Sequence, residues 1–148
     1  MSLWRPPQSI RVISIGLHWR KGRLLACEVT DDSGAVKGVR PLGGAVEFGE
    51  TWQTALKREF QEELGIGVSV GGPPIVMENI FVHEGVTGHE IVFAAEVLFP
   101  EGAFRDQTLI RFIEDSNASS VARWFDLDEL DATGVELYPT GLRDRLTA

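Results

Sequence analysis

Three glutamates on one predicted helix are the residues whose type and spacing point most directly to chemistry. Glu59, Glu62 and Glu63 stand at positions i, i+3 and i+4 of Thr51–Leu64, a segment that contains no glycine or proline. At about 100° per residue, side chains with this spacing converge on one side of a helix. Three converging carboxylates repel one another, and a hard cation that prefers oxygen ligands, Mg²⁺ or Mn²⁺, would relieve that repulsion.

The other residues of the segment decide which side of the helix those acids occupy. Around the helix, the apolar stripe comprises Trp52, Ala55, Leu56, Phe60 and Leu64, and the opposite, water-facing side comprises Gln53, Thr54, Lys57, Arg58 and Gln61. Glu59 and Glu63 fall within the stripe and Glu62 lies at its edge. Two interpretations stay open on angles alone. Either a cation sits among the acids, with Arg58 pairing to one of them, or the glutamates reach past the helix edge into solvent.

The loop before this helix has the spacing of a phosphate-binding loop but the wrong charge. Gly44–Thr51 reads G-x-x-x-x-G-E-T, whereas a P-loop reads G-x-x-x-x-G-K-[ST]. Glu50 replaces the lysine that contacts phosphate and would repel it, so a P-loop kinase or ATPase is excluded. The G-x-G-x-x-G dinucleotide fingerprint is also absent from the sequence.

The loop and the helix together resemble a known motif. Gly44–Ile66, GAVEFGETWQTALKREFQEELGI, is similar to the Nudix box, G-x5-E-x7-R-E-U-x-E-E-x-G-U, where U is a bulky apolar residue. The nine specified positions all match: Gly44, Glu50, Arg58, Glu59, Phe60, Glu62, Glu63, Gly65 and Ile66. The family usually has proline directly before the paired glycines, whereas here Leu42 separates Pro41 from them. We expect that departure to affect substrate preference more than catalysis.

The resemblance implies a hydrolase that cleaves the pyrophosphate of a nucleoside diphosphate linked to another group, by attack of water at phosphorus. It implies these ligands for Mg²⁺ or Mn²⁺: Glu59, Glu62, Glu63 and the Gly44 carbonyl. Arg58 would orient the glutamates, and Glu50 would support that network from the loop. The implied fold is an α/β/α sandwich, a mixed β-sheet with the loop and helix of the box on one side.

A general base must take the proton of the attacking water. Glu63 is the candidate within the box, and Glu114 and Asp115, in a later irregular loop, are the candidates outside it. The two loop acids are equally compatible with a plain solvated surface. The alternative function is a catalytically silent Nudix-fold module that binds a nucleotide or regulates a partner. Such relatives typically lose box carboxylates, and this chain keeps all of them.

Whole-chain properties narrow the class of protein. The 148 residues predict a single domain spanning 1–148, with 43% hydrophobic and 24% charged residues. The net charge of −8 argues against a nucleic acid polymer as partner. No apolar run approaches the roughly 20 residues needed to span a bilayer, and the first residues lack the apolar core of a signal peptide. We therefore expect no membrane partner and a flexible N-terminus.

The single cysteine, Cys27, excludes a disulfide scaffold within the chain and a zinc site with several cysteines. It favours a cytoplasmic location, and it also excludes the zinc ribbon of family members that cleave NADH. The chain has little room for the extra N-terminal strands of dimeric ADP-ribose hydrolases. Nucleoside triphosphates, dinucleoside polyphosphates, sugar nucleotides and ADP-ribose all stay open as substrates, and a homodimer is compatible with the sequence.

Strand and turn signals predict the elements that position the box. Expected strands are Ile10–His18 and Gly22–Thr30 in a hairpin-like opening, a short strand within Val39–Gly49, Pro74–His83, His89–Phe99 and Val121–Leu127. Thr51 is expected to cap the box helix and Gly65 to end it. Gly71–Pro74 is expected to break the chain, Pro100–Ser120 to be an irregular loop, and 130–146 to hold a short helix.

Other candidate residues carry weaker signals. The three histidines, His18, His83 and His89, are scattered and favour structural or surface roles over a zinc site. Arg40 precedes the glycine loop and either reaches a phosphate or lies on the surface. The aromatic residues that either stack a base or fill the core are Phe81, Phe112 and Trp124.

Overall fold

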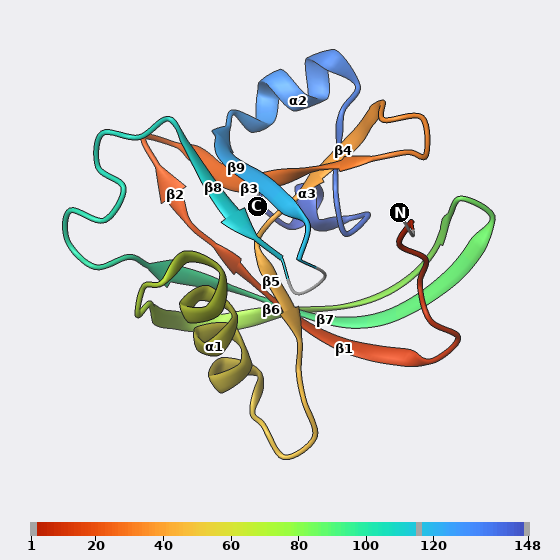
Figure 1. The fold of residues 1–148 in the computed structure, drawn as a ribbon, viewed down its shortest axis with the longest axis horizontal. Coiled ribbons are helices and arrows are strands. Elements are labelled where there is room, and N and C mark those ends of the chain that lie inside the picture. The colour runs from red at the N-terminus through yellow and green to blue at the C-terminus, as the bar shows by residue number, and fades with distance from the viewer. Residues whose placement is uncertain (1–2, 115–116, 147–148) are drawn as a thin grey trace.

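Two β-sheets form the body of the protein (Figure 1). The structure, a computed structural model, describes residues 3–114 and 117–146. The first sheet has four strands, in the spatial order β5 (Gly43–Ala45), β1 (Ile10–Leu17), β7 (Val86–Leu98) and β6 (Ser69–His83). Strand β1 runs parallel to β7 and antiparallel to β5, so this sheet is mixed.

The second sheet has six strands. In spatial order they are β10 (Glu136–Leu137), β4 (Val36–Arg40), β3 (Arg23–Thr30), β9 (Ser119–Phe125) and β8 (Leu109–Ile113), with β2 (Trp19–Arg20) also paired to β3. Strand β10 is parallel to β4, whereas the other pairs are antiparallel. The second sheet is therefore mixed as well.

Three helices complete the described fold: α1 (Trp52–Leu64), α2 (Leu127–Thr133) and α3 (Leu142–Arg145). Figure 1 shows α1 and α2 on opposite sides of the strands. No helix within the described residues has the length and apolar character needed to cross a membrane.

Helix α1 begins and ends where its sequence predicts. Its N-cap is Thr51, whose hydroxyl accepts a hydrogen bond from the Thr54 N–H at 3.1 Å. Its C-cap is Gly65, which adopts the left-handed conformation with φ of 69° and donates to the Gln61 carbonyl. Because both signals are local, the bounds of this helix are readable without the rest of the fold.

The apolar stripe of α1 packs as predicted. Ala55, Leu56 and Phe60 are buried, and Glu59 is buried with them. A Cβ on Gly16 of β1 would come within 2.6 Å of the Phe60 ring, so a glycine lets the helix lie directly on the strand. The core cluster that includes Phe60 also takes in side chains of β3, β7, β8 and β9.

A second core cluster forms around the three inward-facing residues of β1, Ile13, Ile15 and Leu17. It reaches the C-terminal elements through Leu130 of α2 and Leu142 of α3. Alternate residues of β1 therefore serve different faces, and Ser14 and Gly16 point to the α1 side.

Several sequence predictions need correction. The hairpin-like opening is confirmed only in part, because β1 pairs with β5 and β7 in one sheet while β2 and β3 form a hairpin in the other. Gly71–Pro74 does not break the chain; it forms an irregularity within β6, where the register shifts between Gly71 and Ile75. Pro100–Ser120 is not wholly irregular, since it contains β8, whose Ile110 and Phe112 are buried. The single mixed sheet is in fact two mixed sheets.

Candidate metal-binding and catalytic site

Arg58 is the centre of the hydrogen bonds in the Nudix-like segment. Its guanidinium makes a two-point contact with Glu50, from Nε to Oε2 at 2.8 Å and from Nη2 to Oε1 at 3.0 Å. Nη2 also donates to the Ala45 carbonyl at 3.0 Å. Arginine suits this position because its planar fork matches a carboxylate. The sequence placed Arg58 on the water-facing side, but its side chain folds back and is only 24% exposed.

The same guanidinium also holds two box glutamates. Nη1 donates to Glu59 Oε1 at 3.0 Å and to Glu62 Oε2 at 3.3 Å. One cation thus ties three carboxylates from the loop and the helix. Arg58 and Glu50 thus make the contacts that their predicted roles require, and the roles themselves stay a prediction.

The electrostatics of this network follow from the contacts. Hydrogen bonding from Arg58, and then from the Glu47 N–H, lowers the pKa of the Glu50 carboxyl to about 2. Hydrogen bonding to Glu50 in turn raises the pKa of the Arg58 guanidinium. Both groups therefore stay charged across the physiological range.

Glu59 lies beneath the glycine loop and is only 3% exposed. A Cβ added to Gly44 would lie 2.4 Å from the Glu59 Cδ, closer than any side chain tolerates. A Cβ on Gly43 would meet the Ser14 carbonyl oxygen of β1 at 2.0 Å. The paired glycines therefore let the loop backbone close over a buried carboxylate.

The remaining acids spread from buried to exposed. Glu63 is half-buried and Glu62 has a side chain that is 47% exposed. Burial raises the pKa of the Cys27 thiol, and the carboxylates of Glu114 and Glu63 raise it further. Both carboxylates therefore lie within electrostatic reach of Cys27. Asp115, the other loop candidate, lies outside the described residues.

Within residues 3–114 and 117–146, no three Asp, Glu, His or Cys side chains form a ready group for a metal ion. The contacts give a reason: Glu59 and Glu62 both turn toward the Arg58 guanidinium. Glu59 and Glu62 both accept a hydrogen bond from Nη1 of Arg58, so these two carboxylates converge as the helix spacing predicts.

The other sequence candidates make contacts outside the Arg58 network. Phe112 and Trp124 are buried in the core, and Phe81 packs on Gly88. The three histidines lie apart, with these closest polar contacts: His18 with Trp124, His83 with Lys37 and His89 with Glu78. Burial lowers the pKa of His18 to about 4, so that ring is neutral at physiological pH. Arg40 is exposed and lies close enough to Cys27 to influence its pKa.

Sequence reasoning missed Ser14. It is fully buried on the α1 side of β1, opposite Gly44 in the strand register. Its hydroxyl has no hydrogen-bond partner within the described part of the chain. A serine in the middle of the apolar strand IRVISIGL is the signal that could have marked it.

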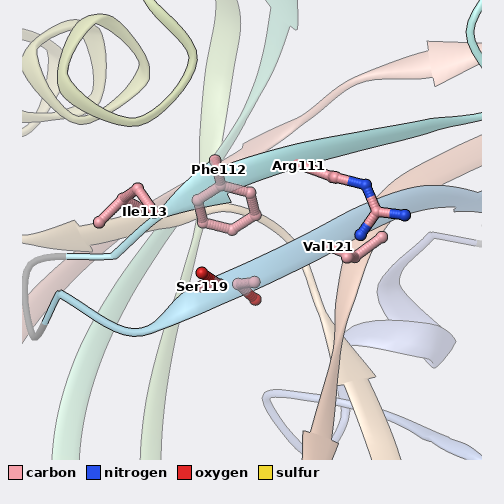
Figure 2. Close-up of a pocket in the computed structure, with 6 residues that line it drawn as sticks. Arg111, Phe112, Ile113, Ser119 and Val121 are labelled. Atoms are coloured by element: carbon pink, nitrogen blue, oxygen red, sulfur yellow. The ribbon is translucent and has the colours of Figure 1, made fainter.

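Figure 2 shows side chains that line a hollow on the β8–β9 hairpin. Its volume is about 250 Å³, and it is lined by Arg111, Phe112, Ile113, Ser119, Ser120 and Val121. No residue of the Nudix-like segment lines it. This hollow is therefore distinct from the carboxylate cluster.

Comparison with known proteins settles the family. A family model described as the NUDIX domain matches residues 9–144. The chain belongs to the Nudix family. Its solved relatives include the MutT NUDIX hydrolase of Burkholderia pseudomallei, at 23% identity and a TM-score of 0.53, covering 82% of this chain and 86% of that one. The MutT protein of Bacillus halodurans has 14% identity and a TM-score of 0.58, covering 93% of this chain and 80% of that one. These similarities confirm the predicted α/β Nudix fold.

Curated relatives match a shorter stretch. The nucleoside triphosphatase NudI of Klebsiella pneumoniae is 44% identical over 55 residues, 37% of this chain and 39% of that protein. NudI of Escherichia coli O139:H28 is 45% identical over 56 residues, 37% of this chain and 40% of that protein. The matched stretch thus spans about two fifths of these relatives' length.

Proposed function

We propose that this Nudix protein is a metal-dependent hydrolase that cleaves the pyrophosphate bond of a nucleoside diphosphate linked to another group. The observation that carries the proposal is the charge network of the box. Arg58 joins Glu50, Glu59 and Glu62, and Gly44 lies directly on the Glu59 carboxylate. We also infer one domain over 1–148, which the family match to residues 9–144 supports.

The donor set fits Mg²⁺ or Mn²⁺. The carboxylates of Glu59, Glu62 and Glu63 and the Gly44 carbonyl offer only oxygens, which hard divalent ions prefer. Glu59 and Glu62 already share one cationic nitrogen, so their charges converge enough to share a metal ion. When bound, such an ion neutralises the pyrophosphate and lowers the pKa of a bound water.

The chain's own residues supply positioning and the base. Glu50 anchors Arg58, which holds the glutamates in place. A carboxylate, Glu63 or Glu114, accepts the proton of the attacking water as the new P–O bond forms and the bridging P–O bond breaks. The charges of Glu63 and Glu114 both raise the pKa of the buried Cys27 thiol, so both carboxylates act on the same part of the core and both are kept as candidate bases.

The test is hydrolysis of a nucleotide panel with Mg²⁺ and with Mn²⁺, beginning with nucleoside triphosphates because NudI is named for them. E62Q and E63Q should each lower kcat by at least about a hundredfold. The matched control is E129Q, which removes an exposed carboxylate on α2 and should retain full activity. Unchanged turnover in E62Q or E63Q would remove that residue from the mechanism.

A second comparison separates the two base candidates. The residue that accepts the proton should, when replaced by glutamine, remove the acidic limb of the pH–rate profile. E63Q and E114Q are the pair to compare. A nucleotide that raises the melting temperature of the wild type without being hydrolysed by it would instead support the silent binding module.

We also propose a homodimer formed through exposed apolar side chains on the face of the first sheet that also carries α1. Strand β6 is an edge strand, and its Val76, Ile80 and Val82 are 50%, 64% and 67% exposed. Ile10 of β1 adds to this apolar face at 63% exposed. Exposed apolar edges favour self-association. Light scattering of the wild type and of I80E would test it, and a monomeric wild type would overturn it.

A further inference from the structure

A basic pocket lies where the β2–β3 hairpin faces the loop before β8, and no residue of the Nudix-like segment lines it. Its volume is about 320 Å³, and it is lined by Arg20, Lys21, Arg23, Arg105, Asp106, Gln107, Thr108 and Trp124. Four cations and one acid give these side chains a formal charge of +3 (4 − 1), on a protein whose net charge is −8. Within the described residues, none of the four cations belongs to an ion pair.

The hairpin that carries three of these cations is unfavourable for folding. Arg20 and Arg23 stand directly opposite each other across the two strands, which places like charges together. Lys21 and Gly22 form the connecting turn with φ of 52° and 77°. Positive φ at both positions is the type I′ pattern, which favours Asn-Gly and disfavours lysine. Both the facing arginines and the lysine at positive φ therefore lower the stability of the hairpin.

One side of the pocket is held in place by contacts of Arg20 within the protein. The Arg20 guanidinium lies 3.4 Å from the centre of the Trp124 ring, and its Nη1 donates to the Phe104 carbonyl at 3.1 Å. That pair of contacts fixes the orientation of one cation, while Lys21 and Arg105 reach the same hollow from the turn and from the opposite loop. Gln107 and Thr108 add neutral hydrogen-bonding groups.

We propose that this pocket binds a small phosphate anion of the pyrophosphate type, at a site separate from the catalytic carboxylates. Clustered arginine and lysine groups with nearby neutral donors suit phosphate oxygens, and a bound anion would offset the repulsion within the hairpin. The pocket lies at the Thr108 end of β8 and Glu114 lies at the other end. The five residues of β8 span roughly 17 Å at about 3.3 Å per residue.

Calorimetric titration of sodium pyrophosphate in EDTA tests the proposal, because the chelator removes metal-bridged binding at the carboxylates. The wild type and E62Q/E63Q should bind equally, and K21Q/R105Q should bind at least about tenfold more weakly. The control K57Q/R111Q removes the same charge from exposed positions and should retain wild-type affinity. No binding by the wild type, or equal loss in the control, would overturn the proposal.

A further variant keeps the test independent of misfolding. K21N supplies the residue that the turn prefers, so it should raise the melting temperature of the free protein while weakening pyrophosphate binding several-fold. Turnover of substrate by K21Q/R105Q should match the wild type if the pocket is separate from catalysis. Equal loss of turnover and of anion affinity would place the pocket within the catalytic site instead.

Discussion

The two charged regions of this Nudix protein differ in how their charges are compensated. At the box, one guanidinium contacts Glu50, Glu59 and Glu62 at 2.8 to 3.3 Å. At the β2–β3 hairpin, Arg20 and Arg23 face each other, and within the described chain neither belongs to an ion pair. The first region is organised by ion pairs within the protein, whereas in the second Arg20 is held by Trp124 and the Phe104 carbonyl, and Lys21, Arg23 and Arg105 are exposed.

We infer from this difference that the charges of the box position catalytic groups, whereas the charges of the hairpin bind a ligand. The box holds its carboxylates in fixed places, so its substitutions should disturb geometry and turnover together. The hairpin carries unfavourable local choices, so its substitutions should improve stability while they weaken anion binding. Four variants, taken from the largest expected effect to the smallest, test this contrast.

R58A should produce the largest effect, because it removes the hydrogen bonds that hold three carboxylates. We expect kcat for nucleotide hydrolysis to fall about 10–100-fold, as for other residues that orient metal ligands. R58K keeps the charge but not the planar fork, and should recover only part of the rate. A full rate in R58A would show that the box carboxylates hold their places without it.

G44A should be next, because the added Cβ would lie 2.4 Å from the Glu59 Cδ. Relief of that overlap requires the loop or the carboxylate to move, which should cost about 1–3 kcal/mol of unfolding free energy and lower kcat. G67A is the matched control, since a Cβ there meets no atom within 4 Å. Its stability should stay within about 0.5 kcal/mol of the wild type in urea unfolding.

His18 supplies the third test, because its ring stacks on Phe99 at 3.7 Å and accepts a hydrogen bond from Trp124, which lines the basic pocket. Burial lowers its pKa from 6.5 to about 4. The unfolded chain then binds the proton first as the pH falls. The stabilising effect of neutral His18 is therefore complete above pH 6.5 and is lost between pH 6.5 and about 4.

The expected loss is about 1–2 kcal/mol, reduced by solvent because the ring is only half-buried. Urea unfolding of the wild type and H18Q across that pH range measures it. H18Q should show a shallower fall in stability. Parallel curves for the two proteins would contradict the assignment of this effect to His18.

K21N should have the smallest effect on the folded protein. Asparagine tolerates the positive φ of 52° better than lysine, and the change also removes one of four clustered cations. We expect the free energy of unfolding to rise by roughly 1 kcal/mol. A decrease in thermal stability would show that Lys21 makes a favourable contribution and would weaken the contrast between the two regions.

Local signals predicted α1 well. The Thr51 cap, the Gly65 terminus and the apolar stripe all lie within the segment itself, so no distant contact was needed. The helix angles placed Glu59 within the apolar stripe but left open whether it reached solvent, and the structure shows that it is buried. The same local reasoning missed β8, although its alternating Ile110 and Phe112 carry a strand signal, because the polar residues around it suggested a loop.

Non-local contacts set the limits of the sequence analysis. The strand pairings could not be predicted, because β1 joins β7 across more than 70 residues of chain while its immediate successor pairs in the other sheet. The return of Arg58 toward Glu50 also depends on how the loop folds over α1. Side-chain directions on a helix are periodic, but the reach of a long arginine is decided by its partners.

The sequence by itself determined the family motif, the box helix and the set of acids, because these depend on residue type and on spacing within one short segment. Only the tertiary structure decided that the charges of Glu63 and Glu114 act on the same buried cysteine, and that Arg20 and Arg105 line one pocket. Each pair is separated by dozens of residues, and a folded chain brings such residues together only through sheet pairing and core packing. The sequence therefore specifies which residues are charged, and the fold specifies which residues lie next to them.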